Sequence, residues 1–415
     1  MKYPLSVGSI DEASRRLVGV VAKTPLQFSP RLSKETGAHV YLKREDLQEV
    51  RSYKIRGAYN LIASLADAER KRGVVCASAG NHAQGVALSC SRLRIKGTIF
   101  MPTNTPRQKI DRVRHFGGRY ADLRIVGNNF DESSALAKAF AKQSDTVFVH
   151  PFDDERVMSG QGTVGKEIVH ELGGKIDIVV CPVGGGGLIA GVGTYCKAAS
   201  SDIAIFGVEA EGAAGMAASL AAGRVVTLGA LDKFVDGAAV RTVGQKTFAT
   251  AKKLVDKIMT VPPGAVCSTM IDLYQNEGIV AEPAGALSVA ALSQFKNLRG
   301  KTVVCILSGG NNDIMRYPEI MERSLTHKGL KHYYLIEFAQ KPGQLKLLIN
   351  RALGPDDDIV RFEYLKKNSK ETGPALLGIE SAKKENAAAL AGRLRQHKIV
   401  FREVCPDDPL IGFML

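Results

Sequence analysis

The sequence predicts an α/β protein in which a mostly parallel sheet is followed by a smaller C-terminal module. Two observations lead to this fold class. Short apolar runs rich in Val and Ile alternate with helical patterns up to about residue 310, and a different pattern begins after about residue 325. Strands that alternate with helices favour a parallel sheet with helices on both of its faces.

The first region supplies strands whose ends are small or polar residues. The expected strands are 73–78, 96–102, 146–152, 176–184, 203–210 and 302–310. The expected helices between them include 81–93, 130–143 and 187–199. Because ligands of open α/β sheets gather at the carboxyl ends of strands, the loops that follow these strands are candidate binding loops.

The C-terminal region has its own order of elements. A strand is expected at 331–339 and a turn with a helix at 341–353, then strands at 358–367 and 374–381, a helix at 385–397 and a strand at 398–404. This βαββαβ order is the ferredoxin-like split βαβ module. We therefore expect a first domain at 1–325, a linker at 326–330 and a second domain at 331–415.

Composition excludes several classes of protein. The apolar fraction of 45% is that of a globular chain, and the charged N-terminus lacks the apolar core of a secretory signal. The seven cysteines are scattered without zinc-site spacing, which suggests reduced thiols in a cytoplasmic protein. The net charge of +14 comes from basic residues interleaved with acids, so we expect no nucleic-acid or membrane partner and some preference for anionic ligands.

The glycine run at 184–187 follows one expected strand and opens an expected helix. Backbone N–H groups of such a run converge on an anion, and the helix dipole adds to the attraction, so we favour phosphate binding over a flexible turn. Gly185, Gly187 and Ala190 also satisfy a dinucleotide pattern, and Glu209 follows about twenty residues later. A nicotinamide or flavin enzyme is therefore an alternative at this point.

Two further loops contain small and polar residues. In "ASAGNHAQG" (77–85), Ser78, Gly80 and Asn81 could hold a carboxylate, or they could simply cap a helix. In "LSGGNND" (307–313), Ser308 can make one hydrogen bond beside glycines that permit close backbone approach. The stretch "SYKIRGAYN" (52–60) carries Lys54, which by itself is no different from an exposed lysine at a helix start.

Taken together, these four stretches resemble the fold-type-II pyridoxal-phosphate enzymes, which have a tryptophan synthase β-like fold. They are most similar to the biosynthetic threonine dehydratases (threonine ammonia-lyases), and the resemblance runs from about residue 10 to the C-terminus. It implies a two-lobed catalytic region at 1–325, with a smaller lobe at about 45–150 and a larger lobe made of the remainder. It implies pyridoxal 5'-phosphate as the cofactor.

The resemblance also implies roles for individual residues. Lys54 matches the lysine that holds the cofactor's aldehyde, and Tyr53 matches a residue, usually Phe, that packs near the ring. Asn81 matches the contact to the phenolic oxygen, and Ser308 matches the hydroxyl at the pyridine nitrogen. The phosphate loop corresponds to Gly184, Gly185, Gly186, Gly187 and Leu188. The substrate-carboxylate loop corresponds to Ser78, Ala79, Gly80, Asn81 and His82.

The implied reaction converts L-threonine to 2-oxobutanoate and ammonia, the first step of isoleucine biosynthesis. A catabolic serine/threonine dehydratase, another β-elimination enzyme and a non-catalytic amino-acid sensor are the alternatives. Ala79 stands where related racemases have a serine, which disfavours racemisation. Gly215 stands where some relatives have an Asp, so a divalent-metal site near Glu209 is incomplete and no metal is assigned; a monovalent cation stays open.

The C-terminal module resembles the ACT-like regulatory domain of biosynthetic threonine dehydratases, present here as one copy. The resemblance implies inhibition by isoleucine, opposed by valine, in a homotetramer. The alternative is a domain that serves assembly and binds no ligand.

Overall fold

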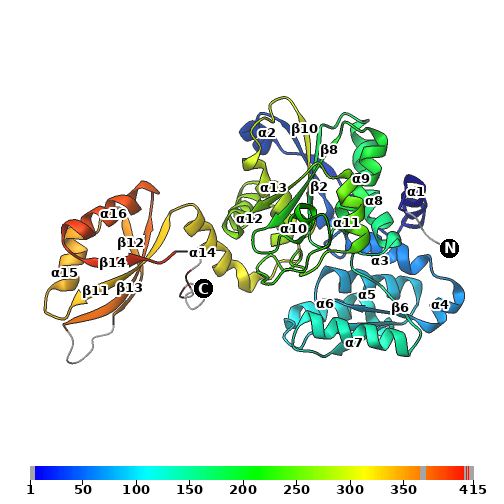
Figure 1. The fold of residues 1–415 in the computed structure, drawn as a ribbon, viewed down its shortest axis with the longest axis horizontal. Helices are drawn as coiled ribbons and strands as arrows, with labels where there is room; N and C mark the ends of the chain where they lie inside the picture. Colours follow the sequence, from blue (N-terminus) through cyan, green and yellow to red (C-terminus); the bar gives the residue numbers. More distant parts are fainter. Residues whose placement is uncertain (1–4, 365–370, 406–407, 409, 411–415) are drawn as a thin grey trace. The chain divides into compact units, whose positions relative to one another are not determined.

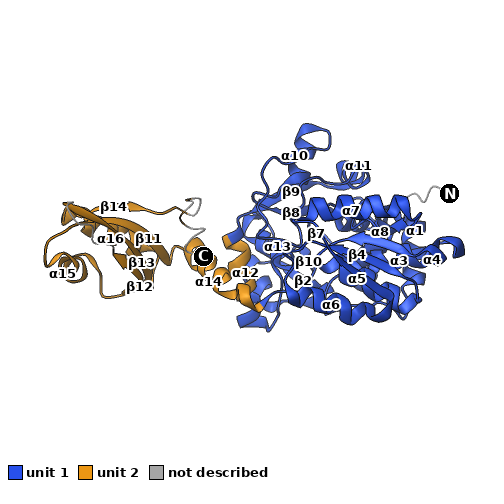
Figure 2. Ribbon diagram, turned by 90° about the horizontal axis from the view of Figure 1, so that it is seen from below, with its two compact units in different colours: residues 1–263, 272–313 blue, residues 264–271, 314–415 orange. Residues whose placement is uncertain are grey.

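The computed structural model describes residues 5–364, 371–405, 408 and 410. Contacts within the chain divide it into two compact units (Figure 2). One consists of residues 1–263 and 272–313, and the other of residues 264–271 and 314–415. No helix of the described residues is long and apolar enough to cross a membrane.

The larger sheet of the first unit has six strands in the order β1-β2-β10-β7-β8-β9. All neighbours run parallel except β1, which is antiparallel to β2. The strands are β1 (Leu26–Phe28), β2 (His39–Arg44), β10 (Thr302–Leu307), β7 (Ile178–Pro182), β8 (Ala204–Ala210) and β9 (Lys257–Val261).

The smaller sheet of this unit is parallel throughout, in the order β5-β4-β3-β6. Its strands are β5 (Ala121–Ile125), β4 (Gly97–Met101), β3 (Val74–Ala77) and β6 (Val147–Phe148). Helix α7 (Phe130–Gln143) packs on β3, and α5 (Asn81–Leu93) packs on α3 (Lys54–Ala63) and α6 (Arg107–Gly117) (Figure 1). Each sheet has its own apolar core.

Long helices connect the two sheets. Helix α8 (Glu155–Leu172) packs against both α3 and α9 (Gly187–Ala199). The other helices of the first unit are α1 (Val7–Arg16), α2 (Pro30–Thr36), α4 (Asp67–Arg72), α10 (Gly215–Ala222), α11 (Gln245–Leu254) and α13 (Pro283–Ala290); α12 (Pro263–Glu277) spans both units.

The expected fold class is confirmed, and the helices α5, α7 and α9 have the expected bounds. The strand expected at 146–152 is shorter, because residues after Phe148 turn away into the loop that reaches Lys54. Strand β2 was not expected because it ends in Lys43 and Arg44, yet both residues are buried. Their ion pairs explain how a strand that ends in charges lies inside the fold.

A buried charge network supports the start of α3. The Arg56 side chain has no exposed surface and binds Glu45 at 2.7 Å and Glu167 at 2.6 Å. Lys43 binds the same Glu167 at 2.7 Å. Burial acts to raise the pKa of Glu45, but Arg56 and Lys43 hold that pKa below its usual value. The network joins β2, α3 and α8. Its central residue, Arg56, lies two residues after Lys54 in the chain.

Removing one partner of this network should be costly. We expect Arg56→Ala to lower the free energy of unfolding by about 3–5 kcal/mol, because it leaves the buried Glu45 without its ion-pair partner and leaves Glu167 with Lys43 alone. Urea unfolding followed by circular dichroism measures the change. The control is Arg107→Ala, whose side chain is 94% exposed and whose loss should cost less than about 0.5 kcal/mol. Equal effects of the two changes would contradict a stabilising network.

The second unit contains a four-stranded antiparallel sheet in the order β12-β13-β11-β14. Its strands are β11 (Lys331–Ala339), β12 (Asp357–Tyr364), β13 (Thr372–Ser381) and β14 (Val400–Glu403). Helix α16 (Glu385–Gln396) covers the core that they share. This is the expected ferredoxin-like order; residues 365–367 of the strand expected at 358–367 lie outside the described residues.

Two local features of this unit differ from expectation. The helix expected within 341–353 is a short α15 (Gln344–Leu347) that widens into a π-helical turn (Leu348–Ala352). Helix α14 (Tyr317–His327) includes the first two residues of the linker expected at 326–330, and the division by contacts falls after Asp313. The domain boundaries at 325 and 331 therefore stay predictions.

Candidate active site

Lys54 is brought beside Ser308 by two segments that lie far apart in the sequence. The backbone N–H of Tyr53 donates to the carbonyl of Ser308 at 3.3 Å, and Ser52 forms a β-bridge with Gly309. Next to these contacts, the Gly310 N–H donates to the Arg51 carbonyl at 2.9 Å. This pairing holds the start of α3 against the end of β10, where ligands of an α/β sheet are expected.

The environment of Lys54 favours a neutral amine. The side chain is partly buried, and its Nζ donates to the Pro151 carbonyl at 3.0 Å. No carboxylate of the described residues is within ion-pairing distance of it. Burial lowers its pKa to about 8, although the charge of Glu282 opposes the shift. A neutral amine is the form that attacks an aldehyde or removes a proton.

The glycine loop between β7 and α9 has the features of an anion cradle. No described residue accepts a hydrogen bond from the backbone N–H groups of Gly184, Gly185, Gly186, Gly187 and Leu188. They stand at the N-terminal end of α9, a helix of 13 residues whose dipole favours an anion. Five successive donors without a partner at a helix N-terminus fit a phosphate group.

The opposite side of this loop is packed against protein. A side chain on Gly185 would overlap the Phe152 ring, and one on Gly187 would lie 3.1 Å from Phe152. Gly186 has φ of +90°, a conformation that favours glycine. The Thr247 hydroxyl donates to the Gly185 carbonyl at 2.6 Å. These contacts explain why glycine is needed, and they hold the N–H groups in place.

The second predicted loop begins α5. A side chain added to Gly80 would meet nothing within 4 Å, so the space in front of it is open. The Ser78 hydroxyl accepts from the Gly80 N–H at 3.2 Å, and Ala79 between them has no polar side-chain atom. Asn81 follows as the first residue of the helix. The loop has room for a ligand beside its backbone.

His82 is held as a neutral side chain. Burial and the nearby charge of Lys54 lower its pKa to about 3. Its Nε2 is 2.9 Å from the Val149 carbonyl, and because a carbonyl only accepts, Nε2 carries the hydrogen. The Nδ1 atom is buried without a partner. His82 therefore brings no positive charge to this loop.

Ser308 and Tyr53 complete the predicted set. The Ser308 hydroxyl is buried and donates to the Ala284 carbonyl at 3.2 Å, so its lone pairs are free to accept. The Tyr53 ring centroid lies 5.3 Å from the Lys54 Nζ. Burial raises the pKa of Tyr53 far above its usual value, so its hydroxyl stays neutral.

Several residues of the site were missed by sequence reasoning. Asn81 donates to Glu282 at 2.6 Å and accepts from Asn311 at 2.7 Å. Glu282 was missed because it precedes a proline at a helix start, where an acidic residue is common. Asn311 belongs to "LSGGNND" (307–313), but the sequence pattern gave it no role. Phe152 and Thr247 carried no signal, because their contacts depend on folding.

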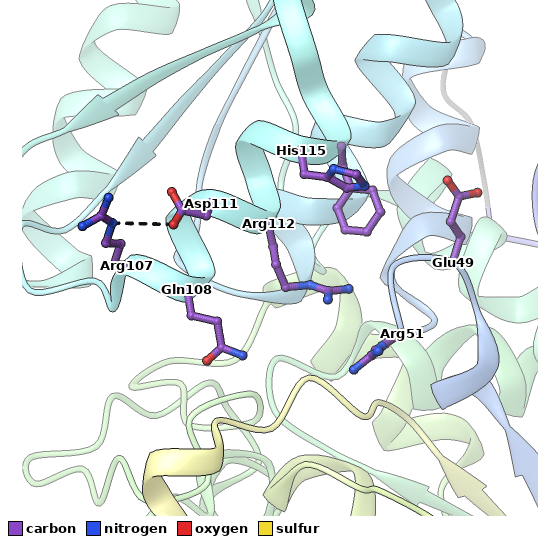
Figure 3. A pocket seen from close by; sticks show the side chains of 8 residues that line it. Glu49, Arg51, Arg107, Gln108, Asp111, Arg112 and His115 are labelled. Atoms are coloured by element: carbon purple, nitrogen blue, oxygen red, sulfur yellow. Dashed lines mark ion pairs between the residues drawn. The ribbon is translucent and has the colours of Figure 1, made fainter.

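An arginine-lined cavity lies at the side of this site. Its volume is about 810 Å³, and it is lined by Glu49, Arg51, Arg107, Gln108, Asp111, Arg112, His115 and Phe116 (Figure 3). Burial lowers the pKa of Arg112, and the like charge of Arg51 lowers it further. A smaller cavity shares Arg51 and Arg112 and reaches Asn311. Positive charge therefore lies close to the residues that hold Asn81.

Glu209 has a structural role. Its carboxylate accepts the backbone N–H groups of Met216 and Ala217, both at 2.8 Å, at the start of α10. Burial raises its pKa to about 7. Among the described residues, no cluster of three or more His, Cys, Asp or Glu could hold a metal ion. Both oxygens of the Glu209 carboxylate therefore bind the backbone at the start of α10. In a dinucleotide or metal site, the same carboxylate would bind the ligand instead.

The fold and the chemistry of this site define a class of protein. Residues 18–309 match the family model described as "Pyridoxal-phosphate dependent enzyme". The N–H cradle fits the phosphate, and the weakly basic Lys54 fits the aldehyde, so the residues present suit pyridoxal 5'-phosphate. The expected cofactor is thereby confirmed.

The relatives identify the family more closely. Residues 322–414 match the model described as "C-terminal regulatory domain of Threonine dehydratase". The chain is 51% identical to the biosynthetic L-threonine dehydratase IlvA of Mycobacterium tuberculosis, covering 100% of this chain and 97% of that one. It is 48% identical to the Bacillus subtilis enzyme of the same name, covering 99% and 98%. The chain belongs to the biosynthetic threonine dehydratase family of pyridoxal-phosphate-dependent enzymes.

Solved structures agree with the fold of this family. The processed form of threonine deaminase isoform 2 from Solanum lycopersicum is 38% identical, with a TM-score of 0.72, covering 77% of this chain and 95% of that one. Maize serine racemase is 32% identical, with a TM-score of 0.71, covering 78% and 99%.

The packing behind the glycine loop predicts a specific sensitivity. Gly185→Ala should weaken cofactor binding by about tenfold or more, because the new methyl group meets Phe152 and moves the N–H groups. Equilibrium dialysis of apoprotein against pyridoxal 5'-phosphate measures this. Gly193→Ala in α9 is the matched control, since its new methyl group would have only ordinary contacts, the nearest at 3.6 Å. Equal affinities of the two variants would show that the loop is not the phosphate site.

Proposed function

We propose that the protein converts L-threonine to 2-oxobutanoate and ammonia. The observation that carries the proposal is the position of Lys54. It lies beside Ser308 at the end of β10, and it donates to Pro151, whose neighbour Phe152 packs on the glycine loop, in a chain related over its whole length to threonine dehydratases. When bound, the cofactor supplies the electron sink that makes the Cα proton removable. β-Elimination releases one water, and the later hydrolysis consumes one. The net reaction therefore converts threonine to 2-oxobutanoate and ammonia.

The residues of the site have separate tasks in this proposal. The Lys54 amine holds the cofactor and afterwards takes the proton from Cα of the substrate. Ser78 and the backbone around Gly80 bind the substrate carboxylate, because their loop opens onto free space at a helix start. Asn81 and Ser308 orient the cofactor ring. Ala79 cannot return a proton to the opposite face of Cα, which directs the reaction to elimination.

Threonine turnover by the purified protein tests the proposal. Formation of 2-oxobutanoate is followed in a coupled assay, with pyruvate from serine measured in parallel. Lys54→Ala should lower the rate by roughly 10³-fold or more, because the base is lost. Lys34→Ala is the control, since Lys34 is exposed on α2 and takes no part in the chemistry. A wild-type protein that binds the cofactor but forms neither 2-oxo acid would overturn the proposal.

We further propose that the domain at 331–415 is regulatory, that the catalytic domain ends at about 325, and that the protein is a cytoplasmic homotetramer. The match of residues 322–414 to a regulatory-domain family and the ferredoxin-like sheet support the first point. The proposed effectors are isoleucine as inhibitor and valine as its antagonist.

The effectors can be tested on the intact protein. Isoleucine should lower turnover at subsaturating threonine by roughly fivefold or more, and valine should reverse the effect, as expected for two ligands that favour different states. Alanine, which is unbranched, serves as the control amino acid. Turnover unaffected by either ligand would leave assembly as the role of the module, and light scattering would then show whether the protein is a tetramer.

A further inference from the structure

A closed ring of hydrogen bonds surrounds the Asn81 side chain. Asn81 Nδ2 donates to the Glu282 carboxylate at 2.6 Å, and Asn311 Nδ2 donates to Asn81 Oδ1 at 2.7 Å. The backbone of Asn311 also hydrogen-bonds to Glu282. The three residues come from α5, from the start of α13 and from the loop after β10. The ring therefore ties together three segments around one amide.

The chemistry of this ring determines which way the Asn81 amide faces. Asn311 Nδ2 also donates to the Val50 carbonyl at 2.7 Å, and a carbonyl can only accept. The nitrogen of Asn311 therefore faces both Val50 and Asn81. Because this nitrogen donates, the Asn81 atom that it meets must be the oxygen. The nitrogen of Asn81 then faces Glu282. The Val50 carbonyl and the Glu282 carboxylate can only accept, and together they determine which atoms of Asn311 and Asn81 are the nitrogens.

Glu282 is an unusual residue to bury. It is 5% exposed, and no cation of the described residues is within ion-pairing distance of its carboxylate. Its side chain packs against Gly309, where a Cβ would overlap it, and its backbone N–H donates to the Gly309 carbonyl at 3.1 Å. A buried acid without a counter-ion lowers stability. Such a group is kept for a reason other than stability.

We propose that Glu282 is a positioning residue that, together with Asn311, holds the Asn81 amide so that its second N–H faces the phenolic oxygen of the cofactor. An amide nitrogen carries two hydrogens, and the ring uses only one of them. With Glu282 absent, Asn311 still donates to the Asn81 oxygen, but the Asn81 nitrogen loses its acceptor, so its second N–H is held less firmly toward the cofactor oxygen. The inference rests on the proposed function only through the role of Asn81.

The charge of Glu282 adds a pH dependence. Burial and the nearby Asp236 raise its pKa to about 7, although Asn81, Lys109 and Asn311 oppose the shift. Lys54 and Tyr53 at the start of α3 also respond to its charge. Because the folded-state pKa lies above the usual 4.5, protonated Glu282 stabilises the apoprotein at low pH. That contribution is lost as the pH rises through about 7.

The experiment compares Glu282→Gln with wild type and with Asp122→Asn, an exposed acid on β5. The affinity of apoprotein for pyridoxal 5'-phosphate should fall about tenfold in Glu282→Gln, since an amide replaces only one of the two acceptors. The absorbance of the bound cofactor should change near pH 7 in wild type and in Asp122→Asn, and this change should be absent in Glu282→Gln.

A double-variant cycle separates positioning from a general loss of structure. In an Asn81→Ala background, Glu282→Gln should have no further effect on cofactor affinity, because Glu282 acts through that amide. Unchanged affinity and absorbance in Glu282→Gln, or the same effect with and without Asn81, would overturn the inference. If Glu282→Gln does not fold, Asn311→Ala should reproduce the loss of affinity. Threonine turnover by wild type tests the proposed function separately.

Discussion

The site depends on the pairing of the segment 51–53 with the segment 308–310. These segments are about 250 residues apart in the chain, and their backbone hydrogen bonds place Lys54 next to the end of β10. The pairing needs glycine at 309 and 310, because added side chains would meet Glu282 and the backbone of Val280. The backbone contact fixes where the Lys54 side chain begins, and the hydrogen bond from its Nζ to the Pro151 carbonyl holds the amine.

The chain contains two buried charge groupings with opposite consequences. Arg56 is neutralised by Glu45 and Glu167, so it joins β2, α3 and α8 at modest electrostatic cost. Glu282 has hydrogen-bond partners but no counter-ion among the described residues, and burial together with the charge of Asp236 raises its pKa to about 7. The first grouping supports the frame of the site, and the second is hydrogen-bonded to Asn81.

The glycine loop is packed against protein on one side. Phe152 and Thr247 hold the loop there, and its N–H groups have no acceptor among the described residues. Lys54 and the loop share a neighbour, because Lys54 donates to the carbonyl of Pro151, the residue before Phe152. The amine and the anion cradle are thus positioned by one short segment after β6.

Much of the fold could be predicted from the sequence, because periodicity and helix-start chemistry are local. The bounds of α5, α7 and α9 and the βαββαβ order were predicted in this way. Strand β2 was not, since Lys43 and Arg44 read as exposed until their partners on other segments are known. Lys54 by itself was no different from an exposed lysine, and it became a candidate, with roles for Asn81, Ser308 and the glycine run, only through the family resemblance of the four stretches together.

The sequence by itself determined the order of elements, the candidate motifs and the family. Only the tertiary structure decided that Lys54 is weakly basic, that His82 is neutral, and that Glu282 and Asn311 hold Asn81. The physical reason is that a pKa and the direction of an amide depend on burial and on partners from distant segments. Those partners are adjacent only after the sheets have formed.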